Sequence, residues 1–259
     1  MPGKDALYQR IKTDIQRQGT LLYILVDPDK VSLAELPGFT AEASEAGVDG
    51  FLVGGSLSLR AQFEETLQSI KVATDNPVVI FPGGIHHLSP NADGLLLLSI
   101  ISGRNPDHLI GQHVLAAPLI KELDIEPIST GYVLVESNGV STTEFLSNSK
   151  PIPRSKPEIA AAHAMAAEML GMKFVYLEAG SGAPQTVPDE MVKMVSTLTD
   201  VPLIVGGGIR TPEEVAQKAQ HGADIVVIGN HFENPENREQ LRTFADAAHT
   251  ASANVPSSV

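Results

Sequence analysis

Short apolar segments recur eight times along the chain, and most are separated by one stretch of helical length. Apolar residues run through them almost without interruption, which is typical of parallel strands buried on both faces. The segments span residues 21–27, 50–55, 78–84, 94–101, 132–136, 174–180, 201–208 and 225–230. The stretches of helical length span 33–46, 58–74, 106–122, 157–171, 188–198 and 212–221, with 235–251 after the last segment. This alternation predicts an α/β fold, a TIM (β/α)8 barrel, with a doubly wound open sheet as the alternative.

The chain of 259 residues is predicted to form a single barrel domain over 1–259, because no linker divides it. An N-terminal helix over about 3–18 is expected before the first strand. Residues 86–93 leave no room for a covering helix, so the helix after the third strand is predicted to be missing or replaced. The polar segment 139–156 is predicted to be a mobile lid over the strand ends.

Composition narrows the classes of partner. With 31 acidic and 18 basic residues the formal charge is −13, which disfavours nucleic acid and would repel a polyphosphate. A bound phosphate would therefore need local attraction, from backbone amides, helix N-termini, a few cations or a divalent ion. The absence of cysteine excludes disulfides and thiolate metal sites, and we expect a cytoplasmic protein because no secretion signal or membrane span is evident.

Glycine-rich turns follow the last two predicted strands. Gly206–Gly208 precede Thr211 and Pro212, a favourable helix start, and Gly229 with Asn230 ends the eighth strand. Glycines let a ligand approach backbone amides closely, and phosphate sites of TIM barrels commonly follow strands 7 and 8. These turns predict a phosphate site, the alternative being that the glycines only form tight turns.

Acidic residues end the first and the sixth predicted strands. Asp27 is followed by a proline, which would hold its carboxylate at the barrel mouth; it is either a Mg²⁺ ligand or a turn-stabilising residue. Ser56, after the second strand, could add a hydroxyl oxygen, and Lys30 either meets a diphosphate or lies at the surface. Glu178 shares its side of the sixth strand with Tyr176. It is either a functional carboxylate or a structural glutamate that accepts backbone hydrogen bonds.

Five motifs occur in order at these strand ends: DPDK (27–30), GVDGFLVGGS (47–56), YLEAGSG (176–182), GGGIRTPEE (206–214) and GADIVVIGN (222–230). Together they resemble the geranylgeranylglyceryl phosphate synthases, prenyltransferases of ether lipid biosynthesis built on a modified TIM barrel. The resemblance implies that the C3 hydroxyl of sn-glycerol 1-phosphate is joined to the geranylgeranyl group of geranylgeranyl diphosphate, with release of pyrophosphate. It also implies a requirement for Mg²⁺, a homo-oligomer, either dimer or hexamer, and at most transient contact with membranes.

The family's functional residues fall on matching positions of this sequence. The resemblance places Mg²⁺ at Asp27 and Ser56. It places glycerol phosphate along Tyr176, Leu177, Glu178, Ala179, Gly180, Ser181 and Gly182, and at Gly207, Gly208, Gly229 and Asn230. Leu25 stands where relatives that use a longer heptaprenyl donor carry a lysine, which favours the geranylgeranyl-type subgroup.

The chemistry of such a transfer assigns roles to two of these residues. The acceptor hydroxyl needs a base at hydrogen-bond distance in a partly desolvated site, which predicts Glu178 as the base and Tyr176 as the residue that orients glycerol phosphate. Two other functions stay open at this point. A sugar-phosphate isomerase or lyase would use Asp27 and Glu178 as an acid and base pair without metal, and a non-catalytic barrel would only bind phosphate.

Three further segments carry predictions. The Ala- and Met-rich face of 157–171 either lines a prenyl groove or packs on the barrel, and the second is favoured. Arg104 either lies near a diphosphate or has no role in the site, and His86 and His87 are expected to be loop residues.

Overall fold

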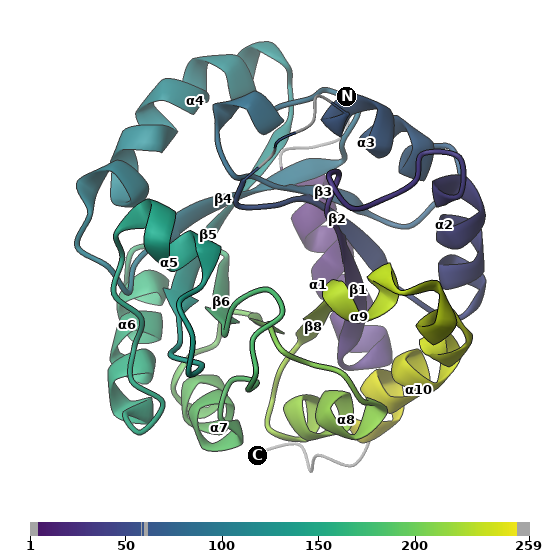
Figure 1. Cartoon of the computed structure of the whole chain (residues 1–259). Helices are drawn as coiled ribbons and strands as arrows, with labels where there is room; N and C mark the ends of the chain where they lie inside the picture. The colour runs from purple at the N-terminus through teal and green to yellow at the C-terminus, as the bar shows by residue number, and fades with distance from the viewer. Residues whose placement is uncertain (1–4, 58, 60–61, 253–259) are drawn as a thin grey trace.

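The computed structural model describes residues 5–57, 59 and 62–252. Eight parallel strands pair in sequence order and close on themselves, since β8 pairs with β1 (Figure 1). The strands are β1 (Leu21–Val26), β2 (Gly50–Gly54), β3 (Val78–Phe81), β4 (Gly94–Ile100), β5 (Glu126–Leu134), β6 (Phe174–Glu178), β7 (Leu203–Gly206) and β8 (Ile225–Ile228). The predicted TIM barrel is confirmed, and the open sheet is excluded.

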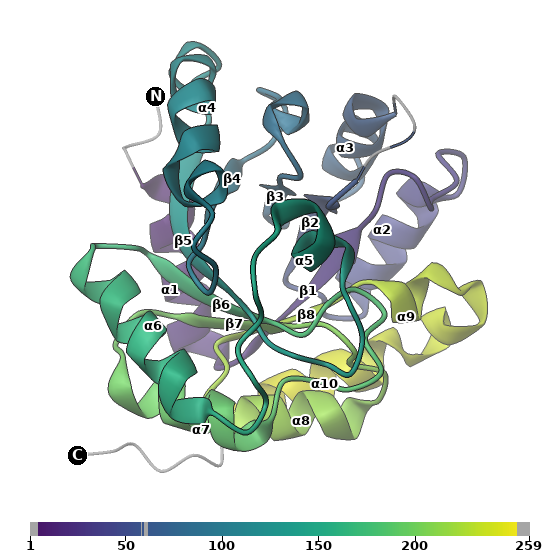
Figure 2. The same cartoon turned by 60° about the vertical axis from the view of Figure 1, so that its left-hand side comes forward.

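Helices form a ring around the strands, as Figures 1 and 2 show. The α-helices are α1 (Ala6–Gln18), α2 (Leu36–Glu45), α3 (Phe63–Lys71), α4 (Gln112–Glu122), α5 (Thr142–Ser147), α6 (Pro157–Met169), α7 (Asp189–Leu198), α8 (Pro212–Gln220), α9 (Asn230–Glu233) and α10 (Leu241–Ser252). Shorter turns are the 3₁₀ helices η1 (Ile85–His87) and η3 (Pro235–Gln240) and the π-helical turn η2 (Asp107–Gly111). Among the described residues, no helix is long and apolar enough to cross a membrane.

Strand alternation divides the core into two layers. Residues such as Tyr23, Phe174 and Tyr176 fill the barrel interior, whereas their neighbours in sequence, such as Val175, pack against the helices. Helix α1 joins the interior cluster through Leu7 and Ile11, and so covers one end of the barrel. The opposite end, where the strands have their C-termini, is left for a ligand.

Helix α1 is held by the beginning of β5. The Glu126 carboxylate accepts hydrogen bonds from the amides of Leu7 (2.8 Å) and Tyr8 (2.9 Å), which satisfies free donors at the helix N-terminus. The fifth strand was predicted over 132–136, and this prediction was wrong at its start. Its first residues are polar or proline, so the apolar pattern does not reveal them, although they pair with β4.

The connection between β3 and β4 lacks a covering helix, as predicted. Only the turn η1 occupies this position, and β3 pairs with β4 at just two residues, Val79 and Ile80. His86 and His87, expected as loop residues, both lie in this connection. His87 is buried there: it stacks on Phe63 at 4.6 Å, and its Nδ1 accepts the Gly83 amide at 3.0 Å. Burial, followed by the nearby His86, lowers the His87 pKa to about 4, so its ring is neutral at pH 7.

Two other segments refine the predictions. The predicted lid 139–156 contains α5, and its second half is tied to the barrel by a β-bridge between Val135 and Ile152. The small face of α6, including Ala160 and Ala164, is buried in the core, so this helix packs on the barrel and does not line a groove. Helix α3 starts at Phe63, and the expected earlier start at residue 58 lies outside the described residues.

Candidate active site

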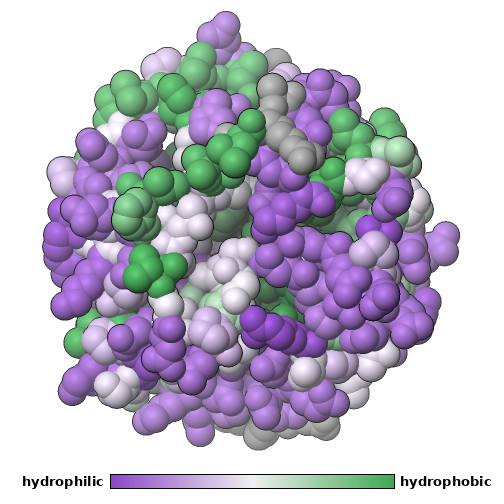
Figure 3. Space-filling model, viewed as in Figure 1, coloured by the Kyte–Doolittle hydropathy of each residue, from purple (hydrophilic) through white to green (hydrophobic). Residues whose placement is uncertain are grey.

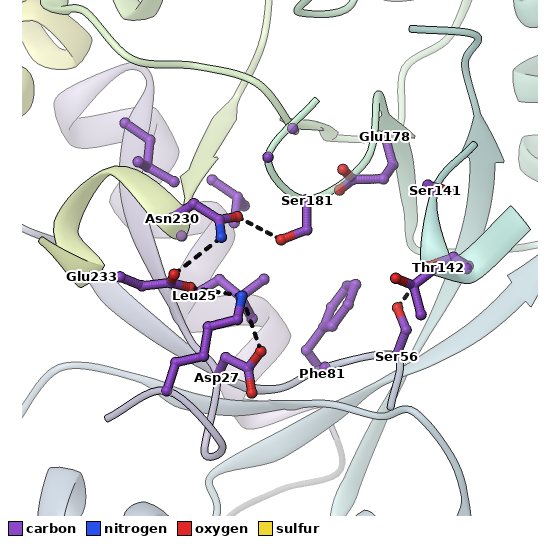
Figure 4. Close-up of a pocket in the computed structure, with 18 of the residues that line it drawn as sticks. Leu25, Asp27, Ser56, Phe81, Ser141, Thr142, Glu178, Ser181, Asn230 and Glu233 are labelled. Atoms are coloured by element: carbon purple, nitrogen blue, oxygen red, sulfur yellow. Dashed lines mark hydrogen bonds and ion pairs between the residues drawn. The ribbon is translucent and has the colours of Figure 1, made fainter. Parts of the chain in front are cut away.

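A cavity of about 570 Å³ opens at the C-terminal ends of the strands (Figure 4). Residues from β1, β2, β6, β7, β8 and the loops after them meet there, together with the segment that precedes and begins α5. The predicted site residues on its wall are Asp27, Ser56, Tyr176, Glu178, Ser181, Gly182, Gly207, Gly208, Gly229 and Asn230. The barrel therefore brings together strand ends that lie up to about two hundred residues apart in the sequence.

Three aromatic rings, Phe81, Tyr132 and Tyr176, form the interior side of this cavity. The Tyr132 and Tyr176 rings meet edge to face at 5.1 Å, and Phe81 lies within 5.9 Å of both. The Tyr176 hydroxyl is buried and makes no well-formed hydrogen bond within the described part of the chain. It lies on the wall of the cavity beside Glu178, so its one O–H can be directed to that carboxylate or to a ligand.

Glu178 is the last residue of β6 and points into the cavity from the interior face (Figure 4). Its side chain is almost fully buried, and Oε1 accepts the Gly180 amide at 2.6 Å. Burial raises the pKa of this carboxyl to about 7, although the hydrogen bond from Gly180 and the hydroxyls of Tyr176 and Tyr132 favour the ionised form. A carboxylate with this pKa can accept a proton near neutral pH.

The remaining residues of the sixth strand end are placed differently from the prediction. Leu177 and Ala179 are buried among the residues that pack against the helices, because alternation turns them away from Glu178. Gly180 donates its amide to Glu178 and does not reach the cavity wall. Of the predicted stretch 176–182, the residues on the cavity wall are Tyr176, Glu178, Ser181 and Gly182.

The turn after β7 brings backbone directly against Glu178. Gly207 has φ +87°, and a Cβ at this position would stand 2.5 Å from Glu178 Oε1 and 2.6 Å from the Gly180 amide nitrogen. Only glycine fits here, both sterically and conformationally. Arg210 braces the same turn, since its guanidinium donates to the carbonyls of Gly208 (2.8 Å) and Ala183 (2.7 Å).

Asp27 and Ser56 face the same cavity from β1 and β2 (Figure 4). The Asp27 carboxylate accepts the Asp29 amide at 3.0 Å and pairs with Lys30, and Ser56 Oγ lies 2.7 Å from the hydroxyl of Thr143 on α5. No cluster of three or more His, Cys, Asp or Glu side chains that could hold a metal occurs within residues 5–57, 59 and 62–252. One carboxylate and one hydroxyl fit Mg²⁺, which keeps several waters and takes substrate phosphate oxygens.

A chain of polar contacts crosses the mouth of the cavity (Figure 4). Lys30 Nζ contacts Asp27 Oδ2 (3.3 Å) and Glu233 Oε1 (3.1 Å). Glu233 Oε2 accepts from the Asn230 amide (3.1 Å), and Asn230 Oδ1 accepts from the Ser181 hydroxyl (2.5 Å). Sequence reasoning missed Glu233: it follows Asn230 by one helical turn, but nothing in the local pattern shows that α9 turns it toward β1.

A model of the PcrB family matches residues 13–248, which is most of the chain. The chain belongs to the PcrB family. The geranylgeranylglyceryl phosphate synthase of Chitinophaga pinensis is 46% identical over 228 residues, covering 88% of this chain and 90% of that protein. The synthase of the same name from Methanothermobacter marburgensis is 42% identical over 226 residues, covering 87% and 91%. The family resemblance predicted from the five motifs is thereby confirmed.

Solved structures agree with this assignment. A structure of (S)-3-O-geranylgeranylglyceryl phosphate synthase from Thermoplasma acidophilum, in complex with its substrate sn-glycerol-1-phosphate, matches with a TM-score of 0.88. That protein is 32% identical, and the match covers 94% of this chain and 98% of the other. Thiamine phosphate pyrophosphorylase from Pyrococcus furiosus, at 13% identity and a TM-score of 0.58, shares the fold alone.

This PcrB-family chain has a second, apolar cavity of about 170 Å³ beside the first. It lies where the helix after β3 is missing, between η1, β4, α4 and α5, and shares Ser56, Phe81, Tyr132 and Thr143 with the larger cavity. Its other walls are mainly aliphatic: Leu88, Leu95, Leu97, Leu98, Ile100, Ala116 and Leu146. Apolar side chains also gather over α4 on the face seen in Figure 3. Arg104 lines neither cavity, which favours the alternative that it has no role in the site.

Proposed function

We propose that the chain is a prenyltransferase that joins the C3 hydroxyl of sn-glycerol 1-phosphate to the geranylgeranyl group of geranylgeranyl diphosphate and releases pyrophosphate. The observation that carries the proposal is the position of Glu178. This carboxylate, with a pKa of about 7, lines the larger cavity together with glycine-rich turns suited to a phosphate, and that cavity adjoins an apolar one suited to a prenyl chain. The similarity to proteins named geranylgeranylglyceryl phosphate synthase supports the same activity.

The acceptor subsite is assigned to the ends of β6, β7 and β8. Among the described residues, the lysine and arginine side chains on the cavity wall are Lys30 and Arg210, and both are already paired, with carboxylates and with backbone carbonyls respectively. We therefore assign the acceptor phosphate to the backbone of Gly207, Gly208 and Gly229, helped by the hydroxyl of Ser181. This local arrangement would bind an anion despite the net charge of −13.

The donor subsite is assigned to Asp27, Ser56 and the apolar cavity. Mg²⁺ held by Asp27, Ser56 and diphosphate oxygens would supply charge neutralisation of the leaving group. The prenyl chain then lies along Phe81 and Tyr132 into the cavity where a helix is missing, because burial of apolar surface there is favourable. Cavity-lining Leu146, partly exposed, extends this apolar path to the surface.

In the transfer, the acceptor oxygen forms a bond to C1 of the prenyl group while the bond from C1 to the diphosphate oxygen breaks. The hydroxyl proton passes to Glu178, which is nearly excluded from water. The buried Tyr176 hydroxyl, which lies beside Glu178 on the cavity wall, orients the acceptor. Phe81, Tyr132 and Tyr176 exclude water from the interior side of the reacting atoms, which disfavours hydrolysis of the donor.

The activity is tested with radiolabelled glycerol 1-phosphate, a series of prenyl diphosphates and Mg²⁺, each with and without chelator. We expect an organic-extractable product that is lost when the chelator is present. Absence of this product with every donor contradicts the proposal. Chelator-resistant conversion of a sugar phosphate would instead identify an isomerase or lyase, and phosphate binding without turnover would identify a binding module.

The path of the prenyl chain is tested by filling the apolar cavity. Ala116 on α4 lines it and is buried, whereas the next residue, Ala117, is exposed and serves as a matched control. Ala116→Trp should lower kcat/KM for the C20 donor by about tenfold or more, with a smaller effect on a C10 donor, while Ala117→Trp should change neither. Equal losses for both donors would place the chain elsewhere.

Assembly and location complete the proposal. We propose a homo-oligomer, either a dimer or a hexamer, in the cytoplasm with at most transient contact with membranes. Light scattering on the purified protein distinguishes the two assemblies, and a monomer would contradict both. Fractionation of source cells tests the location.

A further inference from the structure

Lys30 lies on the wall of the larger cavity but has no role in the transfer proposed above. It follows Asp27 by three residues in a turn closed by a hydrogen bond from the Lys30 amide to the Asp27 carbonyl (3.0 Å). Its ammonium lies on the cavity wall between two carboxylates, 3.3 Å from Asp27 Oδ2 and 3.1 Å from Glu233 Oε1. Lys30 is therefore the counter-ion of the carboxylate assigned to the divalent cation.

The charges at this place constrain what can happen when the donor binds. The Lys30 ammonium partly neutralises Asp27 and so weakens the attraction of this carboxylate for Mg²⁺. The ammonium and the metal ion would also repel each other at such distances. Glu233 is held by the Asn230 side-chain amide (3.1 Å) and remains a second partner for Lys30. An ammonium released from Asp27 would therefore stay anchored at the cavity wall, next to the arriving diphosphate.

We propose that Lys30 is a positioning residue that exchanges partners when the donor binds. In the free enzyme it neutralises and orients Asp27. When the donor arrives, the divalent cation takes the place of the ammonium at Asp27, and Lys30, still paired with Glu233, contacts the diphosphate. This inference rests on the proposed function, because it takes Asp27 as the metal ligand and a diphosphate as the donor headgroup.

The exchange predicts that loss of the Lys30 charge raises the affinity for the divalent cation and lowers the affinity for the diphosphate. Both affinities can be measured without turnover. Binding of Mn²⁺ alone is followed by electron paramagnetic resonance, and binding of inorganic pyrophosphate in saturating Mg²⁺ by calorimetry. Lys30→Met removes the charge and keeps most of the length. We expect it to bind Mn²⁺ alone about threefold or more tighter, because a competing cation is gone, and Mg²⁺-pyrophosphate about threefold or more weaker.

Two variants control for other effects. Lys193→Met, at an exposed position of α7, makes the same change in net charge away from the cavity, and we expect both affinities to match the wild type. Lys30→Arg keeps the charge and should restore the wild-type order of affinities. If Lys30→Met only impaired folding, both affinities would fall. The exchange instead predicts that the two affinities change in opposite directions.

The outcomes separate this inference from the proposed function. The exchange is overturned if the wild type binds both probes but Lys30→Met has an unchanged affinity for either probe or a weaker affinity for Mn²⁺. That outcome leaves the prenyltransferase proposal standing. Failure of the wild type to bind Mn²⁺ or Mg²⁺-pyrophosphate, together with no prenylated product, overturns both. Opposite shifts in Lys30→Met, absent from Lys193→Met, support the exchange.

Discussion

Replacement of Glu178 by glutamine separates its proposed catalytic role from a structural one. Glutamine has the same shape and keeps an oxygen that can accept the Gly180 amide, now 2.6 Å from Oε1, but it cannot take a proton from the acceptor hydroxyl. Turnover should therefore fall by about 10²-fold or more, the usual contribution of a general base. Glu122→Gln, at an exposed position near the end of α4, is the matched control and should be fully active.

The same change should stabilise the protein at alkaline pH. Burial raises the Glu178 pKa from 4.5 to about 7, so the folded chain holds this proton more tightly than the unfolded chain. Wild-type stability from this group falls as pH rises from about 4.5 to about 7, and the loss at pH 8 is about 3 kcal/mol at 1.36 kcal/mol per pKa unit. Glutamine removes that loss, which corresponds to a Tm higher by roughly 5 °C or more.

Two assays test this reasoning. Thermal unfolding of both proteins at pH 5 and pH 8 should show the Tm gain of Glu178→Gln mainly at pH 8. The kcat/KM of the wild type should rise with pH up to about 7, and the variant should lack this limb. Near-normal turnover of Glu178→Gln would refute its role as the base, and a lower Tm at both pH values would show that it is a structural acceptor.

Three other substitutions test two residues of the proposed site and one ion pair outside it. Gly207→Ala should displace the proposed base and lower kcat/KM by about 10²-fold, since its Cβ would overlap the carboxylate. Gly171→Ala, also at positive φ (+77°) but with no atom within 4 Å of the added Cβ, controls for backbone strain, and equal losses would contradict this reasoning. Tyr176→Phe should raise KM for glycerol 1-phosphate by about tenfold, because it removes the hydroxyl proposed to orient the acceptor. An unchanged KM would remove Tyr176 from the acceptor site. The hydrogen bond from His249 to Asp49 (2.9 Å) raises the His249 pKa, against the opposing effect of burial. The stability that this pair contributes is fully present below pH 6.5 and is lost as pH rises through the folded-state pKa. His249→Gln should therefore remove this pH dependence of Tm.

Much of the fold followed from the sequence, because buried parallel strands leave a strong apolar pattern. That pattern failed at the start of β5, where Glu126 and Pro127 belong to the strand but look like loop residues. It also gives no sign that His87, in the connection after β3, is buried, because that burial depends on Phe63 in another element. Patterns of hydrophobicity report how a segment is buried on average, and do not report which distant residue covers one particular side chain.

The candidate site divides in the same way. Strand ends identified Asp27 and Glu178, because in a parallel barrel all C-terminal ends meet at one face. The motif for glycerol phosphate included Leu177 and Ala179, although the alternation of side chains along β6 turns both away from the cavity. A motif records which residues occur together, whereas the direction of each side chain decides which of them a ligand can touch.

The amino-acid sequence by itself determined the barrel, its missing helix and the residues at the strand ends, because these depend on local periodicity and on turn chemistry. Only the tertiary structure decided which side chains meet: that Glu178 is buried deeply enough to raise its pKa to about 7, and that Lys30 lies between Asp27 and Glu233. Asp27 and Glu233 are separated by nearly the whole chain. Both contact Lys30 because closure of the barrel pairs β8 with β1 and brings the loops after these two strands side by side.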